Sequence, residues 1–336
     1  MKIKIYNRLI SSTSPPYIVA EIGSNFDQSL NKALRLINVA KNCGADAVKF
    51  QLFNGKKLYP NNKKMRKLFE KNQLNSEWIS ILKKHCLKIR IHFFLSVFDE
   101  DSLNIAIKNK IKLFKIASSE ITNFSLLKKI AIQKKPIFVS TGMSDLDDVK
   151  RALKVTKSQK NNKIILMQCG SLYPLDNEKV NLNVLDTFKK KFKCLLGFSD
   201  HTLGCDAAIV ALGKGSVVFE KHITLNKKSD GPDHFYAAEP QEFRDYVKKI
   251  RECEKLIRKE EININPKVRA TARRKSIFIK VNSKKNSVIS KKNIQILNND
   301  ARGIDIRYFN YLLGFKFKKN VKKNTPLEWP NIEFKE

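Results

Sequence analysis

The chain has 336 residues, 42% of them hydrophobic, and a formal net charge of +34. This length suffices for one large domain and a small one, and the apolar share suffices for a full core. No apolar run reaches transmembrane length, and the first residues do not resemble a signal peptide. Six cysteines are scattered without a CxxC pair, so we expect reduced thiols and a cytoplasmic protein.

The positive charge raises the alternative of a nucleic-acid or other polyanionic partner, because neutralising phosphates drives such binding. Lysine is spread along the whole chain, however, and no base-reading motif accompanies it. Several lysines fall on the polar faces of expected helices, such as Lys128 and Lys129. We therefore expect a general positive field that attracts anionic substrates, and no nucleic-acid partner.

Eight short apolar runs recur along the first 220 residues, each followed by a polar turn and an amphipathic stretch. The runs are Tyr17–Glu21, Ala45–Phe50, Ile91–Ser96, Leu113–Ala117, Ile137–Ser140, Lys163–Cys169, Cys194–Phe198 and Ser216–Glu220. Continuous apolar runs are typical of strands in a parallel sheet. After the first run, Leu30, Leu34 and Ile37 share one helix face, and Gly44 is a plausible end of that helix. Eight strands separated by helices predict a (β/α)8 TIM barrel, with an open doubly wound sheet as the alternative.

In a TIM barrel the active site lies at the carboxyl ends of the strands. Polar residues stand at or just past the ends of the predicted strands: Glu21, Lys49, Gln51, Ser96, Lys115, Ser118, Glu120, Ser140, Ser171, Tyr173, His201 and His222. If the last two strands are neighbours, their ends lie about 4.8 Å apart. Two imidazoles so placed could share one divalent metal ion. The alternative is a pair of core histidines bound to backbone carbonyls.

The composition changes after an expected helix at Gln241–Ile257. We predict a barrel domain over residues 1–257, a linker over 258–275 that contains Pro266, and a small β-rich module over 276–336. About 60 residues give only a marginal core, so we expect this module to lean on the barrel or on a partner subunit.

Several stretches, in order and at characteristic spacing over residues 17–245, resemble the sialic acid (N-acetylneuraminate) synthase family. They are Ala20–Gly23, Gly44–Gln51, Lys115–Asn123, Ser140–Met143, Gly197–Gly204, Glu220–Leu225 and Gly231–His234. The resemblance implies a transferase that condenses phosphoenolpyruvate with an open-chain N-acetylmannosamine-like sugar and releases phosphate by C–O cleavage. The last 60 residues resemble, more loosely, the antifreeze-like (SAF) domain of that family, which implies a domain-swapped homodimer.

The resemblance also implies roles for individual residues. Phosphoenolpyruvate would be held by Lys49, Gln51, Lys115, Ser118, Ser140 and Ser199. His201 and His222 would bind a divalent metal, for which two histidines and oxygen ligands favour manganese over magnesium. Glu21, Asp233 and Tyr173 match positions near the sugar and the metal, and Glu120 is a candidate base for the attacking water.

The chain departs from the family pattern at several positions. Phe26 stands where the family usually has a histidine, and the segment around Val97 is one residue shorter and lacks a threonine. Ser171 replaces an asparagine, and Arg302 is the candidate for an arginine that the family's SAF domain supplies. These changes leave the identity of the sugar substrate undetermined.

Three alternatives follow. A legionaminic or pseudaminic acid synthase would use a related sugar. Another phosphoenolpyruvate-using, aldol-type barrel enzyme would have a related active-site geometry. A basic polyanion-binding protein with a decayed site would belong to a different class.

Overall fold

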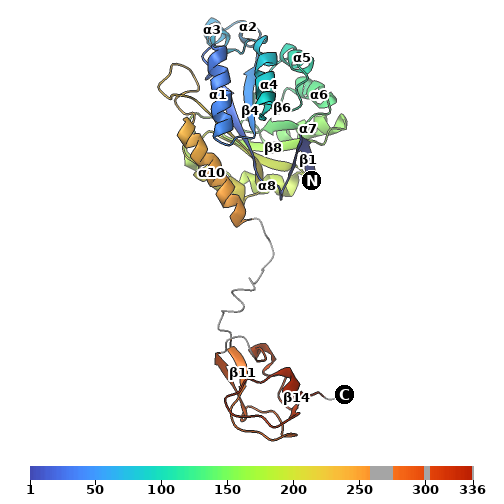
Figure 1. Ribbon diagram of the computed structural model, residues 1–336. Coiled ribbons are helices and arrows are strands. Elements are labelled where there is room, and N and C mark those ends of the chain that lie inside the picture. The colour runs from blue at the N-terminus through green and yellow to red at the C-terminus, as the bar shows by residue number, and fades with distance from the viewer. Residues whose placement is uncertain (258–274, 299–302, 335–336) are drawn as a thin grey trace. The chain divides into compact units, whose positions relative to one another are not determined.

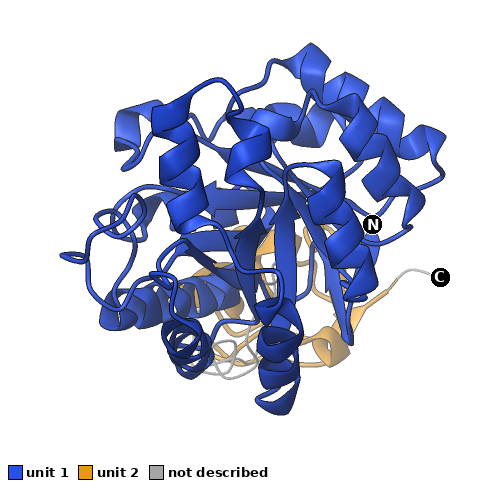
Figure 2. Ribbon diagram, turned by 90° about the horizontal axis from the view of Figure 1, so that it is seen from above, with its two compact units in different colours: residues 1–259 blue, residues 260–336 orange. Residues whose placement is uncertain are grey.

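A computed structural model describes residues 1–257, 275–298 and 303–334. The chain divides into two compact units, Met1–Lys259 and Glu260–Glu336 (Figures 1 and 2). The predicted linker 258–275 lies outside the described residues except for Lys275, which begins the first strand of the second unit.

Eight parallel strands of the first unit close into a barrel in the order β10-β3-β4-β5-β6-β7-β8-β9. They are β3 (Tyr17–Gly23), β4 (Ala47–Leu52), β5 (His92–Val97), β6 (Phe114–Ile116), β7 (Ile137–Ser140), β8 (Ile164–Cys169), β9 (Leu195–Asp200) and β10 (Ser216–His222). Each predicted apolar run overlaps one of these strands, and β10 pairs with both β9 and β3. The predicted TIM barrel is therefore confirmed, and the open-sheet alternative is wrong.

Helices surround the barrel, as Figure 2 shows from above. They are α1 (Leu30–Asn42), α2 (Gly55–Leu58), α3 (Lys63–Asn72), α4 (Trp78–Lys88), α5 (Glu100–Lys108), α6 (Phe124–Ile132), α7 (Leu146–Ser158), α8 (Val184–Lys191), α9 (Asp206–Gly213) and α10 (Pro240–Leu256). Local chemistry sets their starts: the Ser29 side chain caps α1, and a capping box joins Asp145 to Asp148 at α7. The apolar face of α1 is buried at Ala33 and Ile37, as its sequence spacing indicates.

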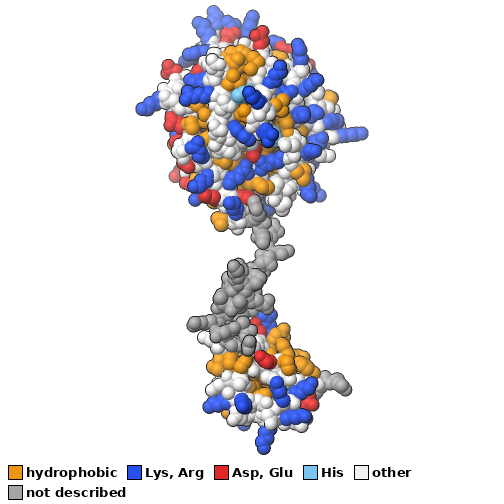
Figure 3. All heavy atoms as spheres, in the orientation of Figure 1, with side chains coloured by type: hydrophobic (Ala, Val, Ile, Leu, Met, Phe, Trp, Pro, Cys, Tyr) orange, Lys and Arg blue, Asp and Glu red, His pale blue; other side chains and the backbone are white. Residues whose placement is uncertain are grey.

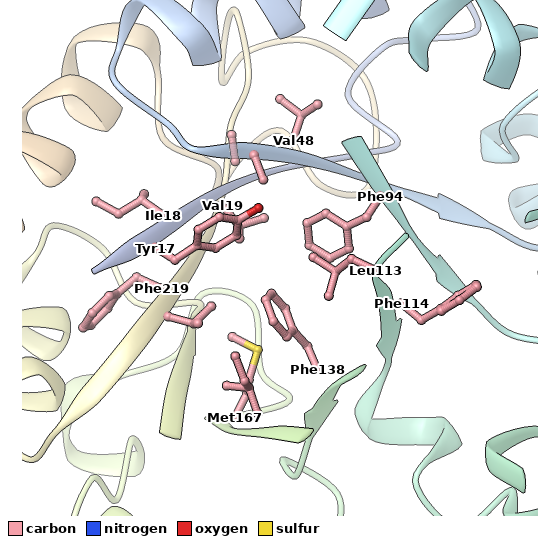
Figure 4. Close-up of a cluster of buried hydrophobic side chains, with 14 of the residues drawn as sticks. Tyr17, Ile18, Val19, Val48, Phe94, Leu113, Phe114, Phe138, Met167 and Phe219 are labelled. Carbon is pink, nitrogen blue, oxygen red and sulfur yellow. The ribbon is translucent and has the colours of Figure 1, made fainter. Parts of the chain in front are cut away.

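The barrel interior is apolar in its middle and polar toward the carboxyl ends of the strands. Tyr17, Phe94 and Phe138 point toward one another in Figure 4, and the Phe138 ring centroid lies 5.5 Å from that of Phe94 and 6.3 Å from that of Tyr17. Met167 closes this layer and meets the ammonium group of Lys115 at 3.4 Å. Because residues two apart on a strand face the same side, Tyr17 and Glu21 both belong to the inner face of β3.

A hairpin that the sequence analysis did not anticipate covers the amino-terminal end of the barrel. Strands β1 (Lys2–Ile5) and β2 (Arg8–Ser11) pair antiparallel. The ring of Tyr6 stacks on His92 with centroids 4.4 Å apart. The guanidinium groups of Arg8 and Arg251 both bind Asp46, which directly precedes β4. Alternating lysine and isoleucine in β1, with the isoleucines buried, is the pattern of a strand with one buried face.

The second unit is small and β-rich, with its own buried cluster. Its elements are β11 (Lys275–Ile279), β12 (Ile294–Asn298), η3 (Ile306–Tyr308), β13 (Lys316–Phe317), η4 (Trp329–Asn331) and β14 (Ile332–Glu333). Strand β11 pairs antiparallel with β12, and β13 pairs antiparallel with β14. Ile277, Ile279, Leu312, Phe317 and Leu327 are buried together.

On the face of the molecule that Figure 3 draws, charged side chains are spread without a single dominant patch. Figure 3 shows lysine and arginine side chains spread over the visible face of both units, mixed with acidic and apolar ones. Among the described helices, none is long and apolar enough to cross a membrane.

Phe26, where the chain departs from the family pattern, is a core residue. Its fully buried ring lies 6.0 Å from that of Phe50 and 6.2 Å from that of Trp78. We expect Phe26→Ala to lower the free energy of unfolding by about 3–5 kcal/mol, since it leaves a cavity. Urea denaturation measures this. Leu87→Ala, at a position 62% exposed, is the control and should change stability by less than about 0.5 kcal/mol. Equal effects of the two substitutions would contradict this packing role.

Candidate active site

A pocket opens at the carboxyl ends of the barrel strands. It is lined by Lys49, Gln51, Ser96, Phe98, Lys115, Ala117, Ser118, Ser140, Cys169, Tyr173, Ser199, His201, Glu220 and His222. The side chains come from seven of the eight strands or from the segments that follow them. This is where TIM barrels carry their chemistry.

Four buried ionisable side chains form the floor of this pocket. The Lys49 ammonium lies 2.8 Å from Glu21 Oε2 and 3.5 Å from Glu220 Oε1. The Lys115 ammonium lies 2.9 Å from the same Glu220 oxygen. All four side chains are at most about 5% exposed. Charges this deep are retained only when they are paired, so each lysine holds a carboxylate in place and is held by it.

The surroundings separate the two carboxyl groups in pKa. Burial raises the pKa of Glu21 to about 7, against the lowering effect of Lys49. Burial acts in the same direction on Glu220, but Lys115 and Lys49 together outweigh it and bring the pKa of Glu220 to about 2. Two carboxyl groups in one site can thus carry different protonation states near neutral pH.

Hydroxyl and amide groups complete the polar floor. Lys49 donates to Ser96 Oγ at 2.8 Å, and Ser199 Oγ donates to Glu220 Oε1 at 3.0 Å. Gln51 donates to Glu21 Oε1 at 2.8 Å. At the end of β5, where the chain is shortened, Ser96 lines the pocket, whereas Val97 is fully buried in the apolar core.

The hydroxyl of Ser118 lies between two other strand ends. It accepts a hydrogen bond from the Gly142 backbone N–H at 3.1 Å and lies 2.9 Å from Cys169 Sγ. Gly142 must lack a side chain here, because a Cβ would lie 2.7 Å from Cys169 Sγ and from Ser171 Oγ. The Ser118 hydroxyl is therefore fixed at the edge of the pocket.

His201 and His222 lie side by side, with ring centroids 5.7 Å apart. His201 directly follows β9, and His222 is the last residue of β10. His201 Nδ1 lies 2.6 Å from the Gly170 carbonyl oxygen, which only accepts, so Nδ1 carries the proton and Nε2 keeps its lone pair. Burial lowers the pKa of His201 to about 3 and that of His222 to about 4. Both imidazoles are therefore neutral at pH 7.

These donors fit a divalent metal held by two protein ligands. Neutral imidazole is the form that binds metals, and His201 has a free Nε2. The described residues include no cluster of three or more His, Cys, Asp or Glu side chains that could hold a metal. Oxygen ligands from water or substrate would have to complete the coordination.

Asp233 lies beside this histidine pair. Its Oδ2 accepts from the backbone N–H of Ser24 at 3.0 Å and from Ser24 Oγ at 2.9 Å. Its Oδ1 accepts from the Tyr236 hydroxyl at 2.8 Å. Gly23, with φ +54°, makes room for the carboxylate, because a Cβ there would lie 2.5 Å from Asp233 Oδ2.

The structure brings most of the residues predicted from the sequence into this one site. Ten line the pocket: Lys49, Gln51, Ser96, Lys115, Ser118, Ser140, Tyr173, Ser199, His201 and His222. Glu21 joins them by its ion pair with Lys49. Asp233 joins them through Tyr236, whose hydroxyl contacts both Asp233 and His222. Ser171 lines an adjoining cavity that shares Cys169 with the pocket.

Among the predicted residues that the structure describes, Glu120 is not brought there. Glu120 is not among the described side chains that line the pocket, and its carboxylate accepts from Asn123 at 3.0 Å instead. It is also not the partner of Lys49 or Lys115, which bind Glu21 and Glu220. Arg302 lies outside the described residues.

Sequence reasoning missed Glu220, Tyr236 and Cys169. A signal for Glu220 was present, since a carboxylate inside an apolar strand is as unusual as the lysine at position 49. Tyr236 gave no such signal, because an aromatic residue in a loop is common. For Cys169 the sequence predicts only a reduced thiol, whereas its sulfur contacts the Ser118 hydroxyl at the pocket wall.

The remaining three histidines have structural partners. Tyr17 and Asn7 bind the two ring nitrogens of His92 at 2.8 and 2.9 Å, and the ring of His85 meets Asn38 at 2.7 Å. His234, whose role the sequence left open, uses both nitrogens, at 2.6 Å from Thr224 Oγ1 and 2.7 Å from Asp27 Oδ1. With both nitrogens engaged, His234 has none free for a metal.

A closed barrel of eight parallel strands, with lysines, serines and paired neutral histidines at one mouth, defines a TIM-barrel enzyme. The sequence assigns it further: residues 36–261 match the model of the NeuB family, and the chain belongs to that family. The N,N'-diacetyllegionaminic acid synthase of Legionella pneumophila is 34% identical over 97% of this chain and 99% of its own. The human N-acetylneuraminate-9-phosphate synthase is 32% identical over 74% of this chain and 73% of its own.

Solved structures agree with this assignment. The N-acetylneuraminic acid synthetase of Leptospira borgpetersenii, solved in complex with citrate, superposes with a TM-score of 0.77 at 29% identity. The match covers 80% of this chain and 94% of that one. Chain and relatives thus share both the fold and the sequence family.

We expect Lys115→Met to destabilise the fold strongly. The substitution removes the ammonium group that pairs with Glu220. The buried carboxylate then lacks its nearest opposite charge, which lowers the free energy of unfolding by about 3–5 kcal/mol. The double variant Lys115→Met/Glu220→Leu should recover most of that loss. Lys214→Ala, which breaks the more exposed pair with Asp186, should cost about 1 kcal/mol or less. Chemical denaturation measures the free energy of unfolding of all three variants. An equal loss of stability in Lys115→Met and Lys214→Ala would refute the role of Lys115 in neutralising Glu220.

Proposed function

We propose that the chain is a nonulosonic (sialic-type) acid synthase that condenses phosphoenolpyruvate with an open-chain acylamino hexose and releases phosphate by C–O cleavage. The observation that carries the proposal is the convergence of Lys49, Lys115 and Ser199 on one pocket beside two neutral histidines. Phosphoenolpyruvate carries phosphate and carboxylate groups, and ammonium and hydroxyl donors are the groups that bind them.

The buried carboxylate of Glu220 already binds the donors that such a substrate would use. In the structure, Lys49, Lys115 and Ser199 all contact Glu220 Oε1. Substrate oxygens would share these donors with Glu220, and Ser118 and Ser140 would add hydroxyl donors from the neighbouring strand ends. The second carboxylate oxygen of Glu220, Oε2, is buried and accepts no hydrogen bond.

We further propose that His201 and His222 hold a divalent metal, with manganese favoured over magnesium by the nitrogen ligands. When bound, such an ion supplies Lewis-acid polarisation of the sugar aldehyde. Asp233, fixed by Ser24 and Tyr236, would orient the sugar hydroxyls. Glu21, with its pKa raised to about 7, would exchange a proton near neutral pH, and this favours it over Glu120 as the acid–base group.

The choice of sugar rests on the relatives. The N,N'-diacetyllegionaminic acid synthases of Legionella pneumophila and Campylobacter jejuni match 97% and 91% of this chain, each at 34% identity. We therefore place a diacetamido hexose of the legionaminic type ahead of N-acetylmannosamine. A pseudaminic acid synthase of Helicobacter pylori is 30% identical over 95% of the chain. It supports the sugar precursor of pseudaminic acid as the second candidate.

We also propose a homodimer in which the small unit acts as a SAF domain on a second copy of the chain. Apolar side chains 45–63% exposed follow four strands at the barrel mouth: Met143, Leu172, Tyr173, Leu203 and Phe235. The small unit has an aromatic cluster of its own, formed by Tyr308, Tyr311, Phe315, Trp329 and Phe334, with ring centroids 5.1–6.5 Å apart. Two such apolar surfaces are typical of an interface.

The six cysteines are free, in keeping with the cytoplasmic location that we propose.

The activity is tested by incubating the purified chain with phosphoenolpyruvate, manganese and a sugar panel. The panel comprises diacetamido hexoses, N-acetylmannosamine and its 6-phosphate. We expect phosphate release that requires both metal and sugar. His222→Ala should lower the rate about 1000-fold, because a lost Lewis acid costs several kcal/mol. His85→Ala is the matched control and should leave the rate unchanged. Phosphate release without sugar dependence, or none with any sugar, would count against the proposal.

For the dimer, light scattering of the full chain should give twice the 38.7 kDa mass of one chain. Trp329→Ala should weaken the dimer because it removes an apolar anchor. Val288→Ala, an exposed position in the same unit but outside the aromatic cluster, should not. A monomer at micromolar concentration would refute this assembly.

A further inference from the structure

Tyr236 connects a predicted metal ligand with a predicted sugar contact. It lies in the segment after β10, and its side chain is buried. Its hydroxyl lies 2.8 Å from Asp233 Oδ1 and 3.4 Å from His222 Nδ1. Its ring meets the His222 ring edge to face, with centroids 4.9 Å apart. One side chain therefore contacts both neighbours at once.

The direction of these two hydrogen bonds follows from the donors available. Asp233 Oδ2 already accepts two hydrogen bonds from Ser24, as an ionised carboxylate does, and a carboxylate only accepts. The Tyr236 hydroxyl must donate its proton to Asp233. Its oxygen is then left as an acceptor facing His222 Nδ1. The His222 proton accordingly belongs on Nδ1, and Nε2 keeps its lone pair.

The carboxylate that anchors this chain of hydrogen bonds cannot turn away. Ser24 binds Asp233 Oδ2 twice, through its backbone N–H and its hydroxyl. The chain passes close by at Gly23, where a Cβ would lie 2.5 Å from that oxygen and 3.4 Å from the His222 ring. The Tyr236 hydroxyl is thus held against a fixed acceptor, and at 3.4 Å it lies at the long end of hydrogen-bonding range from His222.

We propose that Tyr236 is a positioning residue that holds His222 as the Nδ1–H tautomer, so that His222 Nε2 is free to bind the divalent metal. This inference rests on the metal site of the proposed function. His201 reaches the same tautomer by another route, through the backbone carbonyl of Gly170. Hydrogen-bond partners of metal-ligating histidines typically tune metal affinity. In this chain a tyrosine hydroxyl stands between the histidine and the carboxylate.

The chain offers a matched control for this role. Tyr17 is a second buried tyrosine whose hydroxyl meets a histidine, 2.8 Å from His92 Nδ1. That pair lies at the amino-terminal end of the barrel strands, at the opposite end from the pocket. Substituting either tyrosine by phenylalanine keeps the ring and removes one buried hydroxyl. A general effect of losing such a hydroxyl would appear in both variants.

The first experiment titrates the purified full chain with Mn²⁺ in the absence of substrates. We expect Tyr236→Phe to raise the dissociation constant for Mn²⁺ by about 10- to 100-fold, and Tyr17→Phe to leave it unchanged. An unchanged constant in Tyr236→Phe would overturn the inference and leave the proposed function standing. A wild-type chain that binds no Mn²⁺ would overturn the proposed metal site together with this role.

A second experiment reads the tautomer directly, without metal or turnover. In ¹⁵N-histidine spectra of the metal-free chain, His222 should be protonated at Nδ1, and its signals are assigned by their loss in His222→Gln. Tyr236→Phe should add a population protonated at Nε2, whereas Tyr17→Phe should not change His222. The same tautomer in wild type and Tyr236→Phe would overturn the positioning role even if metal affinity changed.

Discussion

Two lysines and two glutamates are paired inside the barrel, and the geometry of the pocket depends on that pairing. Removing a charge from water costs several kcal/mol, and mutual attraction repays the cost only when partners are close and further hydrogen bonds are made. Lys115, Lys49 and Ser199 meet this condition by sharing a single oxygen of Glu220. The cations that would bind an anionic substrate are therefore fixed in place before it arrives.

The two ends of the barrel use similar chemistry for different purposes. At the amino-terminal end, Tyr17 and Tyr6 enclose His92 beneath the β1–β2 hairpin, and Asp46 joins two arginines from distant parts of the chain. At the carboxyl end, the tyrosine–histidine contacts involve residues whose polar atoms face the pocket or its edge. The first arrangement stabilises the fold, and the second would position reactive groups in the proposed function. This division is typical of TIM barrels.

The departures from the family pattern also separate by location. Phe26 and Val97 are fully buried in the core, so these two changes are matters of packing. Ser96 contacts Lys49 directly, which keeps a hydroxyl at the end of β5 despite the shortened segment. Ser171 lies in the adjoining cavity, and the groups at the pocket floor are intact.

The sequence by itself determined the eight strands, the barrel they form and ten of the residues that line the pocket, with Ser199 identified only through the family resemblance. Strand periodicity and the rule that barrel chemistry lies at strand ends are local properties, so they can be recognised from a single chain. Only the tertiary structure decided which charges are partners. Lys115 and Glu220 are 105 residues apart, and Ser24 and Asp233 are 209 apart. Such contacts depend on strand order and register around the closed barrel, which no local pattern encodes. The structure also joined Tyr236 to His222, which lies 14 residues away in the chain. It placed Glu120 in a local contact with Asn123, three residues away, and not in the pocket.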